Sequence, residues 1–131
     1  MPDYDYELLV IGSGPAGHRA AIQAAKLGKR VAVAERRNRL GGVSIHTGTI
    51  PSKTLRQAVL EQLATRPLDV LDPTRVEDTE REAIQQLLDR AAAVVSAETA
   101  ITREQFRRNR VGLLPGNARF TDDHTSGEWF A

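Results

Sequence analysis

The chain has 131 residues, of which 40% are apolar and 27% are charged, an ordinary composition for one globular domain. Its formal net charge of +1 supplies no strong field for nucleic acid or membrane surfaces, so neither is expected as a partner. Because the chain contains no cysteine, it has no disulfide, no thiolate metal site and no thiol relay of its own.

The N-terminal part of the chain predicts a strand, a helix and a second strand. Residues 1–7 lack the basic region of a signal peptide, and the apolar run that follows is too short to cross a bilayer, so a cytoplasmic protein is expected. Residues 7–11 and 30–34 have the apolar pattern of buried parallel strands. Between them, Ala16, Ala20, Ala24 and Leu27 repeat at helical spacing, and Gly28 is expected to end the helix. This order predicts an α/β, Rossmann-like fold with a parallel sheet.

The middle of the chain predicts a loop and two helices. Residues 36–50 are rich in loop-forming residues, and Pro51 then opens a helix. One face of that helix is expected to be Leu55, Ala58, Val59 and Leu63, before a break at Pro67, Asp72 and Pro73. A longer helix is expected over residues 77–98. Its predicted buried side is Ile84, Leu87, Leu88, Ala91 and Val95, and its wet side Glu80, Arg81, Asp89 and Arg90.

The C-terminal part predicts a short helix and one more strand. Thr102 is expected to cap the helix with Gln105 as its partner, and the helix ends in a solvated basic cluster of Arg103, Arg107, Arg108 and Arg110. Residues 111–114 predict a strand and 118–120 a short extended piece. Residues 122–131 show neither a strand nor a capped helix, and no function is assigned to Trp129 and Phe130 beyond a hydrophobic contact.

A G-x-G-x-x-G motif, Gly12-Ser-Gly14-Pro-Ala-Gly17, lies between the first strand and the first helix, the context in which it binds dinucleotides. Gly12 permits a tight turn, Gly14 lets the backbone approach a pyrophosphate, and Gly17 lets the helix lie close to the strand. Pro15 and Ala16 begin the helix, whose free N–H groups and positive dipole end face the phosphates. The motif therefore predicts a phosphate-binding loop.

Glu35 ends the second predicted strand, eighteen positions after Gly17. A carboxylate there can accept hydrogen bonds from both ribose hydroxyls of an adenosine, and it repels the 2′-phosphate of NADP. Glycine turns also occur for purely structural reasons. Here the strands, glycines, helix and acid are all in register, which favours a dinucleotide site.

A second motif, Gly41-Gly-Val-Ser-Ile-His-Thr-Gly-Thr-Ile-Pro-Ser-Lys53, resembles the flavin-site segment of the lipoamide dehydrogenase and glutathione reductase superfamily. Members have a Gly-Gly pair, two cysteines and a Pro-Ser-Lys type ending on a helix; here Ser44 and Thr49 take the cysteine positions. Within the superfamily, residues 48–56 are similar to the soluble pyridine nucleotide transhydrogenases, as are 4–6 and 116–120. The resemblance covers nearly the whole chain, fades after residue 124, and implies FAD as the cofactor.

The resemblance also implies which residues contact FAD. Residues 35–44 are expected to wrap the adenosine and pyrophosphate, and Ser44 and Thr49 to flank the isoalloxazine ring. Lys53 is expected beside the flavin N5–O4 edge, where a cation stabilises the charge that develops on reduction. The alternative is a surface lysine in a first helical turn, where it opposes the helix dipole. Further expected cofactor contacts are Arg36, Gly41, Gly42, Val43, Gly48, Gly116 and Ala118, the last two through backbone groups at the adenine.

The three histidines are not expected to form a metal site. His46 lies in the flavin segment, where a hydrogen bond to a loop carbonyl is favoured over a catalytic role. His18 and His124 have no partner at metal-ligand spacing and are interpreted as structural or exposed.

The missing cysteines restrict the chemistry. A dithiol relay needs a thiolate that attacks a disulfide, and serine and threonine cannot supply one. The leading hypothesis is therefore the FAD-binding portion of an oxidoreductase that transfers hydride between NADPH and NAD through the flavin. One alternative is a cysteine-free NAD(P)H:quinone or diaphorase-type reductase. The other is a non-catalytic adenine-dinucleotide-binding module, which would bind NAD or ADP without flavin.

The resemblance further implies domains that 131 residues are too few to contain. We expect residues 1–131 to be the N-terminal part of an FAD-binding domain that is incomplete at its C-terminus, without the NAD(P)-binding and dimerisation domains. The strand that returns to the FAD domain is expected to be absent as well, leaving an exposed sheet edge and no activity from this stretch alone. Family members suggest a homo-oligomer. A fragment and a truncated reading frame both fit.

Overall fold

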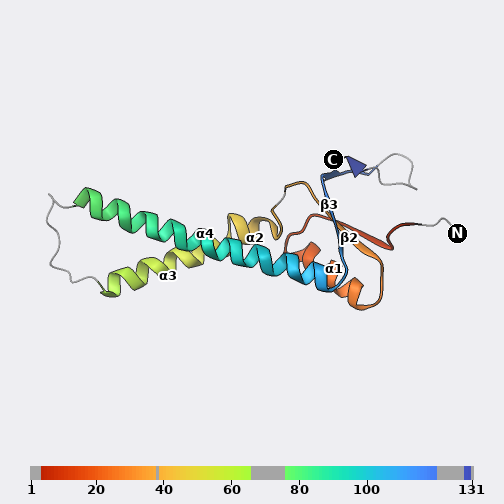
Figure 1. Cartoon of the computed structure of the whole chain (residues 1–131), viewed down its shortest axis with the longest axis horizontal. Coiled ribbons are helices and arrows are strands. Elements are labelled where there is room, and N and C mark those ends of the chain that lie inside the picture. The colour runs from red at the N-terminus through yellow and green to blue at the C-terminus, as the bar shows by residue number, and fades with distance from the viewer. Residues whose placement is uncertain (1–3, 38, 66–75, 121–128, 131) are drawn as a thin grey trace.

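The computed structural model describes residues 4–37, 39–65, 76–120 and 129–130. Figure 1 shows a small sheet at one end of the molecule and two long helices that extend away from it side by side. The sheet contains β1 (Leu8–Ile11), β2 (Val31–Glu35) and β3 (Gly112–Pro115), all parallel, with β2 in the centre. The predicted α/β class with a parallel sheet is confirmed.

The sheet packs against α1 (Pro15–Lys26). Along β1 the side chains alternate: Leu8 and Val10 pack against the core, whereas Leu9 and Ile11 point to the opposite face and are exposed. Its central position makes β2 almost fully buried. The carboxyl ends of these strands therefore meet at one edge, next to the start of α1.

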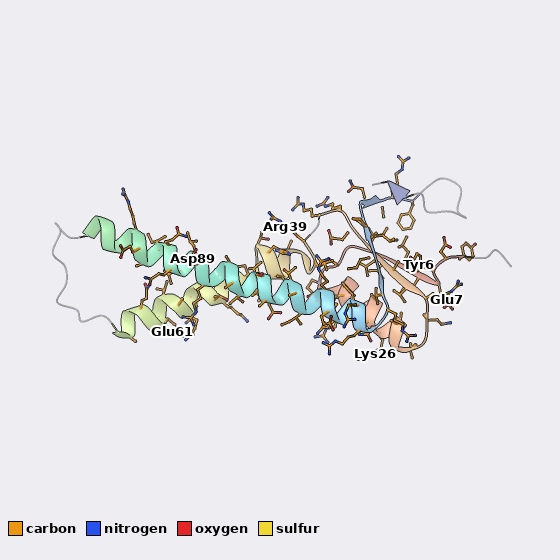
Figure 2. The ribbon with its side chains drawn as sticks, viewed as in Figure 1. Tyr6, Glu7, Lys26, Arg39, Glu61 and Asp89 are labelled. Atoms are coloured by element: carbon orange, nitrogen blue, oxygen red, sulfur yellow. The ribbon has the colours of Figure 1, made fainter. Side chains whose placement is uncertain are left out.

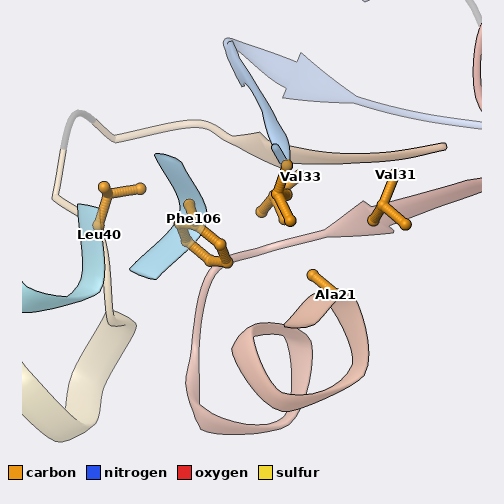
Figure 3. Close-up of a cluster of buried hydrophobic side chains, with 6 residues drawn as sticks. Ala21, Val31, Val33, Leu40 and Phe106 are labelled. Carbon is orange, nitrogen blue, oxygen red and sulfur yellow. The ribbon is translucent and has the colours of Figure 1, made fainter. Parts of the chain in front are cut away.

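The core lies between α1, the sheet and the C-terminal part of the last helix (Figure 3). Ala21 on α1 is fully buried, whereas Ala16, Ala20 and Leu27 are exposed. Of the helical repeat seen in the sequence, only Ala24 packs against the core. Because α1 lies very close to the sheet, the helix face that contacts the sheet consists of small residues on the same side of the helix as Gly17. The buried core residues are Ala21, Val31, Val33, Leu40, Phe106 and Val111.

The two long helices are α3 (Thr49–Thr65) and α4 (Val76–Arg108). A single helix replaces the two expected over residues 77–108, so the prediction that Thr102 caps a separate helix is wrong. No glycine or proline interrupts α4, and the Thr99 hydroxyl donates to the Val95 carbonyl at 2.8 Å within the helix. Thr102 is 5% exposed inside the same helix.

Contacts between α3 and α4 bury only a narrow stripe of each helix. Ala58 and Ala91 are buried as predicted, but Val59, Ile84 and Leu88 are exposed. The buried faces are narrower than predicted because each helix of a two-helix hairpin covers only one side of its neighbour. Glu61 lies on α3 beside α4 (Figure 2), where its carboxylate accepts a hydrogen bond from Arg90 at 2.6 Å. The expected break at 67–73 and the side chains of Leu63 and Glu80 lie outside the described residues.

Two segments expected to be irregular contain short regular elements. The loop over 36–50 includes α2 (Gly42–His46), and α3 begins at Thr49 rather than at Pro51. Near the C-terminus, β4 (Asn117–Ala118) pairs antiparallel with β5 (Trp129–Phe130). The prediction that 122–131 supplies no strand is therefore wrong. A two-residue pairing of this kind depends on a tertiary contact and has no periodicity for sequence analysis to detect.

Both α1 and α4 end in the same hydrogen-bond arrangement, in which one residue has a positive φ. Gly28, with φ 78°, donates to the Ala25 carbonyl; Arg110, with φ 56°, donates to the Arg107 carbonyl. Glycine adopts this conformation without strain, whereas a residue with a Cβ is strained there. As predicted, the basic residues form a solvated helix end, where exposed Arg107 pairs with Glu104 at 2.7 Å.

We expect Arg110→Gly to raise the free energy of unfolding by about 0.5–1 kcal/mol, because it relieves the left-handed strain while glycine entropy offsets part of the gain. The matched change Gly28→Ala introduces the same strain into α1 and should lower the free energy of unfolding by a similar amount. Thermal melting of both variants checks the pair. A lower melting temperature for Arg110→Gly would contradict the interpretation.

His18 of α1 packs edge-to-face against Phe106 of α4, with 5.1 Å between ring centroids. Its Nε2 is buried and, among the described residues, has no hydrogen-bond partner. Burial lowers the pKa of His18; the nearby Arg19 charge also lowers it, and a hydrogen bond with Gln105 partly opposes the change. The side chain is therefore structural, as expected, and is held neutral.

Below the ordinary histidine pKa of 6.5, the unfolded chain takes up a proton at His18 that the folded chain resists, so folding stability should fall as the pH drops through this value. His18→Leu keeps an apolar contact with Phe106 and should make the loss of melting temperature between pH 7.5 and 5.5 shallower. An identical pH dependence in His18→Leu and the parent chain would rule out this role.

Candidate functional site

The glycine loop connects the end of β1 to the start of α1. The Gly12 amide donates to the Ala34 carbonyl at 2.8 Å, which fixes the loop to β2. Gly14 is the N-cap residue of α1, and it provides no side chain to occupy the N–H groups of the first turn. Pro15 follows, and the first turn contains no acidic residue. The positive end of the α1 dipole and its N–H groups are thus available to an anionic group.

Protein packing requires a glycine at Gly17 but not at Gly14. A Cβ built on Gly17 would collide with the Gly12 carbonyl oxygen and lie 3.0 Å from Val10 Cγ1, so the helix can approach β1 only with glycine here. A Cβ on Gly14 would meet no protein atom within 4 Å, and its φ of −61° suits any residue. Protein packing therefore does not require Gly14. A pyrophosphate can approach the backbone closely only where no side chain fills the space, as at this glycine.

The Glu35 carboxylate is fixed at the end of β2. Its Oε2 accepts hydrogen bonds from the Ser13 amide at 3.0 Å and the Ser13 hydroxyl at 2.6 Å, and its Oε1 accepts one from the Arg37 amide at 3.1 Å. Partial burial alone would raise the pKa of Glu35, but these hydrogen bonds and the nearby Arg36 charge outweigh it, and the pKa is lowered. Glu35 is therefore ionised at neutral pH.

A hollow of about 260 Å³ lies beside Glu35, at the carboxyl ends of the strands. This volume is close to the lower end of the roughly 300–1,000 Å³ found for small-molecule sites. The Gly116 amide donates to the Glu35 carbonyl at 3.0 Å, so an adenine contact from Gly116 would involve its carbonyl group. The hollow is lined by Ile11, Gly12, Ala34, Glu35, Arg36, Gly116, Asn117 and Ala118.

A second hollow, of about 280 Å³, lies beside the glycine loop and α2. It is lined in part by Ser13, Pro15, Gly41 and Ser44. The two loops touch, since a Cβ on Gly42 would lie 3.0 Å from Gly14 Cα. The fold thus brings together the glycine loop, the end of β2, the start of α2 and the turn after β3, which are far apart in the sequence.

Other residues expected at the flavin lie outside these two hollows. Val43 is 72% exposed, and Thr49 and Lys53 are exposed at the N-terminal part of α3. His46 Nε2 donates to the Leu40 carbonyl at 2.9 Å, which is the structural role favoured for it. His124 lies outside the described residues.

Sequence reasoning missed Ser13 and Asn117. Ser13 is fully buried and bonds both Glu35 and Gly41, whereas Asn117 lines the first hollow. A serine between two motif glycines was the available signal for Ser13. Within the described ranges, no group of three or more His, Asp or Glu residues is placed to hold a metal ion. No described helix has both the length and the apolar character that crossing a membrane requires.

Several known proteins are similar to this chain. The soluble pyridine nucleotide transhydrogenase of Mycobacterium tuberculosis is 48% identical over 122 residues, covering 92% of this chain and 26% of that protein. A protein of the same name from Escherichia coli is 43% identical over 128 residues, covering 95% of this chain and 27% of that protein. The chain spans about a quarter of the length of these curated relatives.

Among solved structures, the HOCl-induced flavoprotein disulfide reductase RclA from Escherichia coli is 29% identical, with a TM-score of 0.63 over 88% of this chain and 22% of that one. The family model described as FAD dependent oxidoreductase matches residues 7–122. That span contains the glycine loop, Glu35, the Gly41–Lys53 motif and the turn at Gly116, and it confirms FAD as the expected cofactor. The chain therefore belongs to the FAD dependent oxidoreductase family.

Proposed function

We propose that this chain forms the adenosine and pyrophosphate side of an FAD site in a flavoprotein that transfers hydride between NADPH and NAD. The observation that carries the proposal is the meeting of Gly12 of the glycine loop, the ionised Glu35 and the turn at Gly116 around one hollow, while Pro15 at the start of α1 lines the second hollow. Bound FAD would supply the two-electron chemistry. The chain's own residues bind and orient the cofactor.

The first hollow and the neighbouring start of α1 together match the parts of an adenosine diphosphate. The N–H groups at the start of α1 bind the pyrophosphate, and the open position at Gly14 lets it approach the backbone. Glu35 accepts from a ribose hydroxyl through Oε1. Gly116, Ala118 and Arg36 line the same hollow, and the backbone of the first two is proposed to contact the adenine.

At the flavin side, the proposed contacts are Gly41, Gly42, Ser44, Gly48 and Thr49. The second hollow beside Ser44 supports this direction for the cofactor. Exposed Lys53 is proposed to extend its ammonium group towards the flavin edge, where it favours the reduced cofactor by its charge. The cytoplasmic location and the homo-oligomeric state expected from the resemblance remain predictions.

The reaction is proposed to proceed without a redox disulfide, because no cysteine of this chain can form one. A quinone or diaphorase-type reductase uses the same site with a different electron acceptor. Electron-acceptor rates measured with a flavoprotein that contains this segment and a nicotinamide site distinguish the transhydrogenase from the reductase. With NADPH as donor, reduction of a NAD analogue should be faster than reduction of a quinone. Faster quinone reduction would favour the alternative.

Calorimetric titration of the chain with FAD, ADP and FMN tests the site itself. FAD and ADP should both bind, whereas FMN should not, because FMN lacks the adenosine that the hollow beside Glu35 accepts. Binding of NAD and ADP but not FAD would favour the non-catalytic nucleotide-binding module. Binding of FMN with equal affinity would place the site elsewhere in the chain.

A further inference from the structure

The Ser13 hydroxyl joins three segments of the site. Its Oγ donates to Glu35 Oε2 at 2.6 Å and accepts from the Gly41 amide at 3.0 Å. The Ser13 amide donates to the same Glu35 oxygen at 3.0 Å. The residue is 0% exposed. The glycine loop, the end of β2 and the start of α2 therefore meet at one buried hydroxyl.

We infer that Ser13 is a positioning residue that sets the direction of the Glu35 carboxylate and, through it, the recognition of the ribose. This inference rests on the proposed function of the hollow. Two hydrogen bonds from Ser13 hold Oε2, whereas Oε1 receives one hydrogen bond within the described residues, from the Arg37 amide. A carboxylate oxygen has two lone pairs, so Oε1 retains acceptor capacity for a ribose hydroxyl.

A small hydroxyl is required because the position needs a donor and an acceptor in one fully buried group. Alanine supplies neither. Ser13→Ala would leave Glu35 Oε2 with only the Ser13 amide, and it would leave the Gly41 amide without its acceptor. A hydrogen bond to an ionised group is stronger than one between neutral groups, so the link to Glu35 is the stronger of the two.

A positioning role predicts a change that a simple loss of packing does not. Glu35 contacts the ribose, so the parent chain should bind ADP more tightly than 2′-deoxy-ADP, which lacks one ribose hydroxyl. If Ser13 acts through Glu35, losing the hydroxyl should reduce that preference. A purely structural effect should weaken both nucleotides by the same factor.

The test is calorimetric titration of the full chain and its variants with ADP and with 2′-deoxy-ADP. We expect Ser13→Ala to weaken ADP binding by about three- to tenfold and to lower the preference for ADP towards that of Glu35→Gln. The double variant Ser13→Ala/Glu35→Gln should bind ADP only slightly more weakly than Glu35→Gln alone, because both changes remove the same interaction. Thr99→Ala, which removes a hydroxyl that donates to the Val95 carbonyl within α4 and lines neither hollow, is the control and should leave the preference unchanged.

Circular dichroism establishes that each variant is folded. If Ser13→Ala fails to fold, Ser13→Cys keeps a side chain of similar shape with weak hydrogen bonding and should reduce the preference in the same way. An unchanged preference in a folded Ser13 variant, or equal weakening of both nucleotides, would overturn the inference. A folded parent chain that binds neither nucleotide would instead refute the proposed function.

Discussion

Gly14→Ala is expected to weaken ADP and FAD binding by about 30-fold or more, equivalent to about 2 kcal/mol, while the chain stays folded. The added methyl group meets no protein atom within 4 Å, and the φ of −61° accepts alanine without strain. It enters the space through which the proposed pyrophosphate would reach the N–H groups of α1. Titration with ADP measures the affinity, and thermal melting measures the stability.

Gly17→Ala is the matched control for this change, because it adds the same methyl group three residues along the loop. That methyl group collides with the Gly12 carbonyl oxygen, so the free energy of unfolding should fall by about 1–3 kcal/mol. The two variants thus separate binding from packing within one motif. Normal ADP affinity in a folded Gly14→Ala variant would exclude the pyrophosphate from this loop.

Glu35→Ala is expected to weaken ADP and FAD binding by at least about tenfold, because a hydrogen bond to a charged group contributes roughly 1.5–3 kcal/mol. The variant also removes the acceptor of both Ser13 hydrogen bonds. Glu7→Ala is the control: Glu7 precedes β1, is bonded to Lys29 at 2.9 Å and is remote from the hollow. Unchanged affinity for ADP in Glu35→Ala would remove Glu35 from the site.

The same carboxylate predicts the pH dependence of binding. Because the hydrogen bonds from Ser13 and Arg37 hold the pKa of Glu35 below its ordinary value of 4.5, the group remains charged at and above that pH. The carboxylate contribution to ADP binding should therefore be constant above pH 4.5 and be lost as the pH falls through the lowered pKa. In Glu35→Gln this acid-side loss should be smaller.

Much of the fold was predictable because its local patterns agree with its tertiary contacts. The apolar runs that became β1 and β2 and the glycine stop at Gly28 each have a physical cause within a few residues. The glycine loop was predictable for the same reason: a turn requires Gly12 and the close approach of α1 to β1 requires Gly17. The pyrophosphate contact at Gly14 stays a prediction.

The rest depended on contacts between distant segments. Ala21, rather than Ala20, faces the sheet because Gly17 sets how closely α1 approaches β1. The sequence did not reveal that α4 is continuous, because Thr102 resembles a helix cap. In the structure Thr102 lies inside α4, where it is buried near the glycine loop and α1. The link from Ser13 to Gly41 spans 28 positions and leaves no periodic trace in the sequence.

The most direct test of the account is the visible absorbance spectrum of the purified chain after incubation with FAD and removal of free cofactor by desalting. We expect the protein fraction to retain flavin absorbance, and Gly14→Ala to lose it while remaining folded. Retention would show that the glycine loop, Glu35 and the Gly41–Lys53 segment together hold the cofactor. A folded parent chain that is colourless after desalting and does not bind ADP on titration would contradict the account.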